Sequence, residues 1–144
     1  MKVNCLSGIT FLVFVMGSFA MTFAQSTSEE YPEVCKTLNY YLEGGTNNDF
    51  EVLQKAFHAN ATMKSVNAEG YKEGNALEIF KEKVKPGPPQ DRITRIVSVS
   101  ISGNTANARL EAEYTDFTYI DYINLLKIEG EWKIVGKIFY KKEG

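Results

Sequence analysis

Two side chains of this sequence have the chemistry of an acid or base catalyst, Asp121 and the single histidine, His58. Asp121 lies among apolar and aromatic residues, where burial raises the pKa of a carboxyl group or requires a hydrogen-bonding partner. Such a carboxyl can act as a general base, or it can hold a tyrosine hydroxyl or face solvent at an open end. Histidine is the residue type most often used for proton transfer near neutral pH, but His58 equally fits a helix C-terminus, where it interacts with the helix dipole. Both residues are therefore candidates, and neither is assigned as catalytic.

Aromatic residues supply the other candidate ligand-binding side chains, with Tyr71, Tyr119 and Trp132 joining Asp121 in that set. Their rings can contact a ligand while a hydroxyl or indole N–H donates a hydrogen bond to it. The alternative is that they form core and rim. Two more tyrosines with the same capacity are Tyr114 and Tyr122.

Several function classes find no support in the sequence. There is no cluster of metal ligands, no nucleophile motif and no phosphate-binding glycine loop, so we predict neither a metal nor a cofactor. The net charge of −2 argues against a nucleic-acid partner. Cys35 is the only cysteine after the N-terminal apolar run, so that part of the chain cannot form an intramolecular disulfide.

The N-terminal segment has the pattern of a signal peptide. Lys2 is followed by an uncharged, apolar run that ends at Ala24 in a small-residue cleavage pattern, ahead of polar residues. We therefore expect a signal peptide over residues 1–24 and a mature, exported chain that starts at about Gln25 or Ser26, periplasmic or extracellular and free of the membrane. A retained membrane anchor is the alternative. Residues 25–144 then form a single domain.

Three helices are expected in the first half of that domain. Apolar residues at helical spacing predict a helix over 29–42, ended by Gly44 and Gly45. Asn48 and Asn75 each precede a glutamate by three residues, which is the capping pattern that starts a helix.

Strands dominate the second half, where the apolar period changes to two. On the strand over 106–114, Ala106, Ala108 and Leu110 lie on one face and charged residues on the other. Helices followed by a meander of strands indicate an α+β domain with an antiparallel sheet covered by helices on one face. The predicted strands are 61–66, 93–101, 106–114, 117–128 and 132–140.

A two-residue turn at Glu129 and Gly130 sets the register of the last two strands. With an unbroken ladder, Asp121 would oppose Ile138 and share its face, and Tyr119 would oppose Tyr140. The predicted inner face, under the helices, carries Trp132, Ile134, Ile138, Leu125, Ile123 and Asp121. A slip of one residue would put Asp121 outside.

The same register leaves an apolar set on the outer face, which marks an interaction surface. We therefore expect a homodimer through the outer face of the sheet. The alternative is that a curved sheet edge or the Lys141–Lys142 tail shields this set. The predicted outer residues are Ile120, Tyr122, Leu126, Val135 and Phe139, interspersed with Asn124, Lys133 and Lys137.

Three stretches of the chain resemble the nuclear transport factor 2-like (NTF2-like) superfamily, in its lumazine-binding-like branch. They are residues 119–139 (YIDYINLLKIEGEWKIVGKIF), 40–45 (YYLEGG) and 57–61 (FHANA). The resemblance implies a cone-shaped, curved sheet wrapped around three helices, with a pocket at the wide end. The superfamily includes isomerases, dehydratases, polyketide cyclases, non-catalytic binders and dimerising domains, so the fold does not give the function.

Three hypotheses follow. The first is an exported, non-catalytic domain that binds a small apolar or aromatic ligand. The second is a small isomerase, cyclase or dehydratase that uses Asp121 and His58, although the two-histidine site of scytalone dehydratases cannot be built with one histidine. The third is a self-associating domain with a vestigial pocket. If Asp121 faces the interior, Asp121→Asn should change ligand affinity more than folding.

Overall fold

The computed structural model describes residues 27–144, so the predicted signal peptide lies outside the described residues. The helical elements of this part are α1 (Thr27–Thr46), α2 (Phe50–Leu53), the single 3₁₀ turn η1 (Gln54–Ala56) and α3 (Ala76–Lys83). The strands are β1 (Phe57–Asn67), β2 (Gly70–Asn75), β3 (Ile93–Ser102), β4 (Thr105–Glu113), β5 (Phe117–Ile128) and β6 (Glu131–Glu143).

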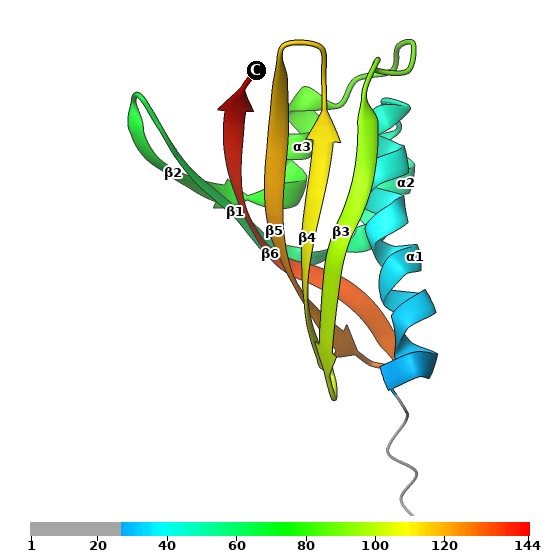
Figure 1. The fold of residues 1–144 in the computed structure, drawn as a ribbon. Coiled ribbons are helices and arrows are strands. Elements are labelled where there is room, and N and C mark those ends of the chain that lie inside the picture. Colours follow the sequence, from blue (N-terminus) through cyan, green and yellow to red (C-terminus); the bar gives the residue numbers. More distant parts are fainter. Residues whose placement is uncertain (1–26) are drawn as a thin grey trace, which may run out of the picture.

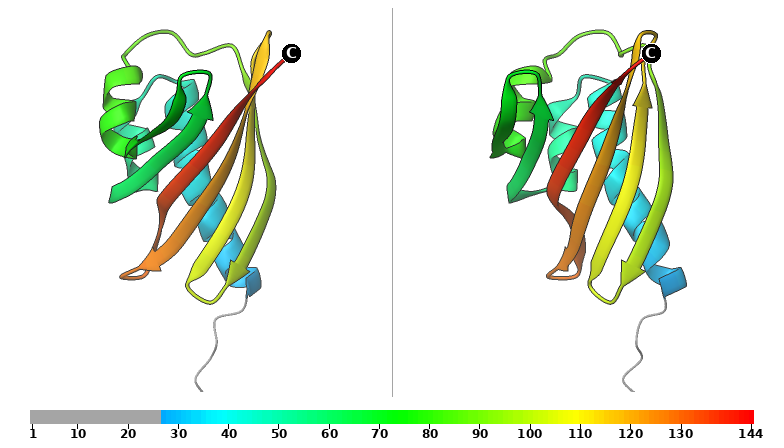
Figure 2. Two further views of the ribbon diagram at one scale, coloured as in Figure 1. Left: turned by 90° about the vertical axis from the view of Figure 1, so that its left-hand side faces the viewer. Right: turned by 60° about the vertical axis from the view of Figure 1, so that its left-hand side comes forward.

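The strands form one curved, open sheet in the order β2-β1-β6-β5-β4-β3, and the helices cover its concave side (Figures 1 and 2). This arrangement confirms the predicted α+β fold. The β1–β6 pair is parallel, whereas every other pair is antiparallel. The parallel pair, which a simple meander does not predict, arises because the C-terminal strand returns between β5 and β1.

Helix α1 is longer than predicted, because it continues through Gly44 and Gly45 to Thr46. A Cβ atom at Gly44 would overlap the backbone of Leu53, and one at Gly45 would lie 2.6 Å from Nη2 of Arg92. These glycines therefore permit close packing against α2 and against Arg92. They do not end the helix.

The two predicted caps have different outcomes. Asn75 is the N-cap of α3 and accepts a hydrogen bond from the backbone N–H of Glu78, as predicted. At α2 the cap is Asp49, which accepts from Val52 N–H, and not Asn48. Asn48 has a positive φ of 53° and its side chain bonds the carbonyl of Pro88, so it shapes the approach to the helix.

The core lies between α1 and the concave face of β4, β5 and β6. The alternation predicted for β4 is confirmed, because Ala106, Ala108, Leu110 and Ala112 are buried. The three alanines of this set leave room for the large side chains around them. The largest fully buried side chains are Leu38, Leu53, Leu110, Ile123, Leu125, Ile134 and Val34.

The unbroken register predicted for β5 and β6 is wrong beyond the turn-proximal half. Leu125 pairs with Ile134 as predicted, but the ladder shifts at Val135, so that Asn124 pairs with Gly136. Gly136, which lacks a side chain, lies at this β-bulge. Every later residue of β6 therefore changes face.

The bulge corrects three assignments. Ile138 pairs with Tyr122 and is 54% exposed, so it belongs to the outer face and not to the core. Phe139 pairs with Asp121 and packs against the core, so it is not an outer-face residue. Lys137, predicted to point outward, is buried on the concave side.

Strand β2 was not predicted from the sequence. It pairs antiparallel with β1, Tyr71 opposite Val66, at the edge of the sheet (Figure 1). Among residues 27–144, no helix is long and apolar enough to cross a membrane.

Candidate functional site

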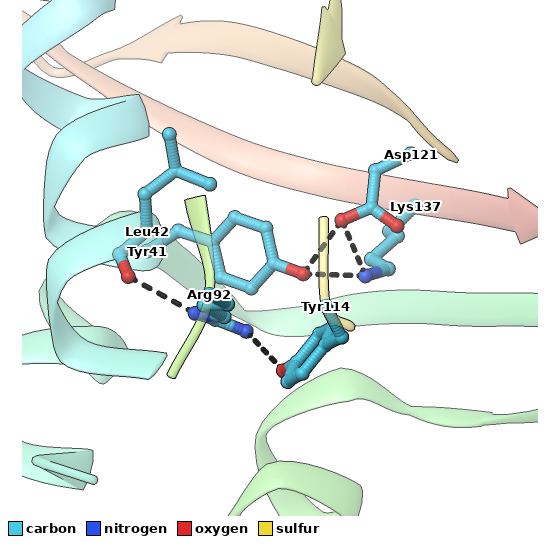
Figure 3. A network of polar contacts seen from close by, with 6 residues as sticks. All are labelled: Tyr41, Leu42, Arg92, Tyr114, Asp121 and Lys137. Atoms are coloured by element: carbon cyan, nitrogen blue, oxygen red, sulfur yellow. Dashed lines mark hydrogen bonds and ion pairs between the residues drawn. The ribbon is translucent and has the colours of Figure 1, made fainter. Parts of the chain in front are cut away.

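Helix α1 directs Tyr41 at two strand residues, Asp121 of β5 and Lys137 of β6 (Figure 3). The Tyr41 hydroxyl donates a hydrogen bond to Asp121 Oδ2 at 2.7 Å. Lys137 Nζ donates to the same carboxylate oxygen at 2.7 Å and to the Tyr41 hydroxyl oxygen. We call these three residues the wide-end triad.

All three members of the wide-end triad are buried, with exposed fractions of 8% for Tyr41, 2% for Asp121 and 6% for Lys137. Burial raises the pKa of the Tyr41 phenol well above its ordinary value, with the nearby Asp121 charge acting in the same direction. Burial also lowers the pKa of the Lys137 ammonium, although Asp121 opposes that change. Asp121 Oδ1 is buried and has no hydrogen-bond partner in the described residues.

Aromatic rings surround the Lys137 ammonium. Its Nζ atom lies 4.9 Å from the ring centroid of Tyr41, 5.0 Å from that of Phe139 and 5.8 Å from that of Phe80. These ring faces stabilise a cation that has lost most of its water. The surroundings therefore hold Lys137 in one place as well as removing it from solvent.

Tyr41 and Lys137 line a cavity of about 270 Å³ at the end of the sheet where α3 and the loop after it lie. We call this end of the domain the wide end and this cavity the wide-end cavity. The charged residues of its lining are Lys83, Arg92 and Lys137, and no carboxylate belongs to it. Its walls thus offer cationic donors and aromatic surface. The lining residues are Tyr41, Gly45, Leu53, Met63, Phe80, Lys83, Val84, Gln90, Arg92, Tyr114, Tyr119, Lys137 and Phe139.

Arg92 forms a second polar network on the opposite wall (Figure 3). Its guanidinium donates to the carbonyl of Leu42 at 3.1 Å, to Thr46 Oγ1 at 2.9 Å and to the Tyr114 hydroxyl at 2.8 Å. Tyr114 in turn donates to Gln90 Oε1 at 2.6 Å. This network ties the loop before β3 to the C-terminal end of α1 and fixes one side of the cavity.

The structure brings some of the predicted site residues together. Asp121 faces the interior between sheet and helices, bonded to α1, and Tyr119 lines the cavity beside it. Tyr114, one of the further tyrosines, also lines the cavity. Tyr122 is 45% exposed on the outer face of the sheet.

Three predicted residues lie elsewhere. Trp132 is buried near the β5–β6 turn, at the other end of α1. Tyr71 is 60% exposed on β2, where its hydroxyl donates to Glu73. His58 lies on β1, and its Nδ1 accepts from the backbone N–H of Asn60 without lining the cavity. His58 and Asp121 therefore do not converge on one site.

Sequence reasoning missed three residues of this site, Tyr41, Arg92 and Lys137. Lys137 was missed because the register was carried across Gly136, and a glycine within a strand is the signal that indicates a bulge. Tyr41 belongs to the apolar periodicity that predicts the first helix, and this pattern does not indicate a buried polar contact. Nothing local marks Arg92, because its partners are 46 to 50 residues away along the chain for Thr46 and Leu42.

A second carboxylate–lysine–aromatic group lies near the β5–β6 turn. Glu30 accepts from Lys127 Nζ through Oε1 and from Trp132 Nε1 through Oε2, both at 2.7 Å. Hydrogen bonding to Lys127 is the main cause that lowers the pKa of Glu30. We call Glu30, Lys127 and Trp132 the turn-end triad. A cavity of about 440 Å³ lies beside it, with mixed charge in its lining.

Comparisons with known proteins agree with this architecture. Residues 29–140 match the family described as "Putative lumazine-binding". The chain is 26% identical over 117 residues to the aldolase FrzH of Cladobotryum sp., covering 79% of this chain and 93% of that protein.

Solved structures give the same fold. An NTF2-like protein from Shewanella baltica OS155 is 28% identical, with a TM-score of 0.74 over 83% of this chain and 98% of that one. An NTF2-like protein from Methylobacillus flagellatus KT is also 28% identical, with a TM-score of 0.72 over 82% and 96%. The chain belongs to the lumazine-binding-like family of the NTF2-like superfamily.

Proposed function

We propose that this protein is an exported domain that binds a small molecule in the wide-end cavity, through an oxygen acceptor on an apolar or aromatic body. The observation that carries the proposal is the charge of the lining, which includes Lys83, Arg92 and Lys137 and no carboxylate. A carbonyl or carboxylate oxygen of the ligand would accept from these donors. The family description, which names ligand binding, supports the same assignment.

The size of the cavity limits the ligand. Its volume of about 270 Å³ lies just below the usual range for drug-sized ligands. The rings of Tyr119, Phe80 and Phe139 supply flat apolar contact surface. A compound with one or two rings and a carbonyl or carboxylate group fits these walls.

Native mass spectrometry of protein purified from its own host tests this proposal. We expect a co-purifying small molecule on the wild-type protein. It should be absent from an Asp121→Asn/Lys137→Met double variant, which removes the buried cationic donor together with its counter-charge. A matched Glu30→Gln/Lys127→Met double variant alters the turn-end triad and should retain the molecule. Retention by the first variant, or loss from the second, would contradict the proposal.

An enzymatic role is the second candidate function. It is favoured by the buried lysine–tyrosine–carboxylate set beside the cavity and by the relative named as an aldolase. Because His58 lies outside the cavity, the acid–base groups available to such an enzyme are those of the wide-end triad. Turnover of an aldol or a retro-aldol substrate that Tyr41→Phe slows would support it.

We further propose that the domain forms a homodimer through the outer face of the sheet. The bulge adds Ile138 and Tyr140 to the exposed apolar side chains of this face, beside a shallow hollow of about 420 Å³. An exposed apolar face of this kind favours a second copy, and self-association is compatible with ligand binding. The exposed residues are Val66, Tyr71, Tyr122, Ile138 and Tyr140.

Light scattering at micromolar concentration tests the dimer. Because Phe139 lines the cavity and Ile138 is exposed on the outer face, Ile138 is the informative position for a substitution. We expect a dimer mass for the wild type and a monomer mass for Ile138→Glu. Lys36→Glu, on the exposed surface of α1 and away from the outer face of the sheet, is the control that should stay dimeric. A wild-type monomer would contradict the proposal.

Export is tested by N-terminal sequencing of the secreted form. We expect a chain that starts at about Gln25 or Ser26. An intact Met1 in a membrane fraction would contradict it.

A further inference from the structure

We propose that the Lys137 amine forms a reversible covalent iminium with the carbonyl carbon of a small aldehyde or ketone held in the wide-end cavity. The inference rests on the proposed function, because the carbonyl compound must first bind there. It assigns Lys137 a covalent role beyond that of a hydrogen-bond donor.

Lys137 is the one lysine among the described residues that is buried, and it also lines a cavity. Two of the three hydrogens of its ammonium are directed at Asp121 and Tyr41. The third hydrogen of the ammonium takes part in neither of these bonds. A carbonyl group in the cavity can therefore approach the nitrogen without breaking the wide-end triad.

The triad also handles the protons of the reaction. Asp121 first takes a proton from the Lys137 ammonium through Oδ2, the oxygen to which Lys137 donates its hydrogen bond. The neutral amine adds to the carbonyl carbon, and a proton passes from nitrogen to oxygen to give a carbinolamine. Tyr41 is hydrogen-bonded to both Asp121 and Lys137. It accepts the proton from Asp121 and passes its own proton to the hydroxyl group of the carbinolamine. Water leaves as the C=N bond forms.

The charges of this sequence balance. An ammonium and a carbonyl become an iminium and one water, so the positive charge on nitrogen before and after the reaction is the same. Asp121 is a carboxylate at both ends of the sequence. The buried pair consequently keeps its net charge, and the reaction creates no uncompensated charge in a region that lacks water.

The buried environment of Lys137 favours a neutral, nucleophilic amine more than the solvent around a surface lysine does. Burial lowers the pKa of the Lys137 ammonium. A desolvated lysine in an apolar pocket is a recognised way to obtain a nucleophilic amine near neutral pH. Exposed lysines such as Lys36, which is 59% exposed, keep their hydration.

Reductive trapping tests the inference on the folded mature domain. The probes are benzaldehyde, cyclohexanone and pyruvate, each with sodium cyanoborohydride at neutral pH, followed by peptide mapping. At least one probe should label Lys137 about tenfold or more faster than Lys36, because the neutral fraction of a desolvated amine is larger. Labelling spread over the exposed lysines, with Lys137 unmodified, would overturn the inference.

Two controls make the result specific. The Asp121→Asn/Lys137→Met variant should lose the selective adduct, and Glu30→Gln/Lys127→Met should keep it. Binding of the non-reactive benzoate is followed separately by NMR. If benzoate shifts resonances of Phe139 and Tyr119 while no probe labels Lys137, the covalent inference fails and the proposed binding function stands. If benzoate does not bind and no probe labels Lys137, both fail.

Discussion

Helix α1 contacts the β5–β6 hairpin through two chemically similar groups, one near each end. Near the turn, Glu30 of α1 meets Lys127 and Trp132. At the wide end, Tyr41 of α1 meets Lys137 and Asp121. Each group holds a carboxylate, a lysine and an aromatic donor, and all the strand residues come from β5 and β6.

The two triads differ in how their carboxylates are satisfied. Glu30 uses one oxygen for Lys127 and the other for Trp132. In contrast, Asp121 accepts both of its bonds through Oδ2 and leaves Oδ1 without a partner in the described residues. A satisfied buried group stabilises a fold, whereas an unsatisfied one carries a free-energy cost that function can explain. This difference supports the proposal that the turn-end triad is structural and the wide-end triad functional.

The largest expected effect on stability comes from Lys137→Met. Removing this lysine leaves Asp121 as a buried, unpaired charge, so the free energy of unfolding should fall by about 3–5 kcal/mol in urea denaturation. Adding Asp121→Asn should restore a large part of the loss.

Lys127→Met is the matched control for that prediction. It should cost less, because the Lys127 side chain is 23% exposed and Glu30 keeps its bond from Trp132. Equal losses for the two lysines would contradict the difference between the triads.

Tyr41→Phe should have an intermediate effect, about 1–2 kcal/mol, because Asp121 loses one of its two donors. The raised pKa of Tyr41 gives this residue a pH signature. Its stabilising contribution is present below pH 10.0, the ordinary tyrosine value, and declines above it because the unfolded chain then loses a proton that the folded protein keeps.

Absorbance titration of tyrosinate checks the Tyr41 prediction. One fewer tyrosine should ionise in the folded wild type than in the unfolded protein, and Tyr41→Phe should remove that difference. Full ionisation of every tyrosine while the fold is intact would contradict the burial of this phenol.

Glu30→Gln should have the smallest effect and a different pH dependence. Because the pKa of Glu30 is lowered in the folded protein, its contribution is complete above the ordinary carboxyl value of 4.5. The contribution is lost as the pH falls through the lowered value, so wild type and variant should converge in acid. Urea denaturation at neutral and acidic pH checks this, and a stability gap that does not narrow would count against the prediction.

The sequence predicted the fold class and most of its elements because their signals are local and repeated, but it did not predict strand β2 or the parallel β1–β6 pair. The alternation along β4 and the cap at Asn75 appear in the structure as predicted. The register failed at Gly136, where one extra residue exchanges the two faces of β6. That single shift moved Lys137 into the site and Ile138 out of the core.

The site was less predictable than the fold, because its contacts join distant segments. Asp121 could be placed inside from its apolar neighbours, but Tyr41 is 80 residues away and Lys137 needs the bulge. Aromatic residues gave ambiguous signals, because the sequence around an aromatic residue does not show whether its ring packs against a helix or lines a cavity. Trp132 and Tyr119 illustrate the two outcomes.

Benzoate binding to the two matched double variants tests the central claim most directly. NMR titration should place benzoate at the wide end of the wild-type domain, near Tyr119 and Phe139. Affinity should be unchanged in Glu30→Gln/Lys127→Met. It should fall at least about tenfold in Asp121→Asn/Lys137→Met, because the charged donor is gone while no buried charge is left unpaired. Equal affinity in the two variants, or a loss confined to the turn-end variant, would contradict the assignment of function to the wide end.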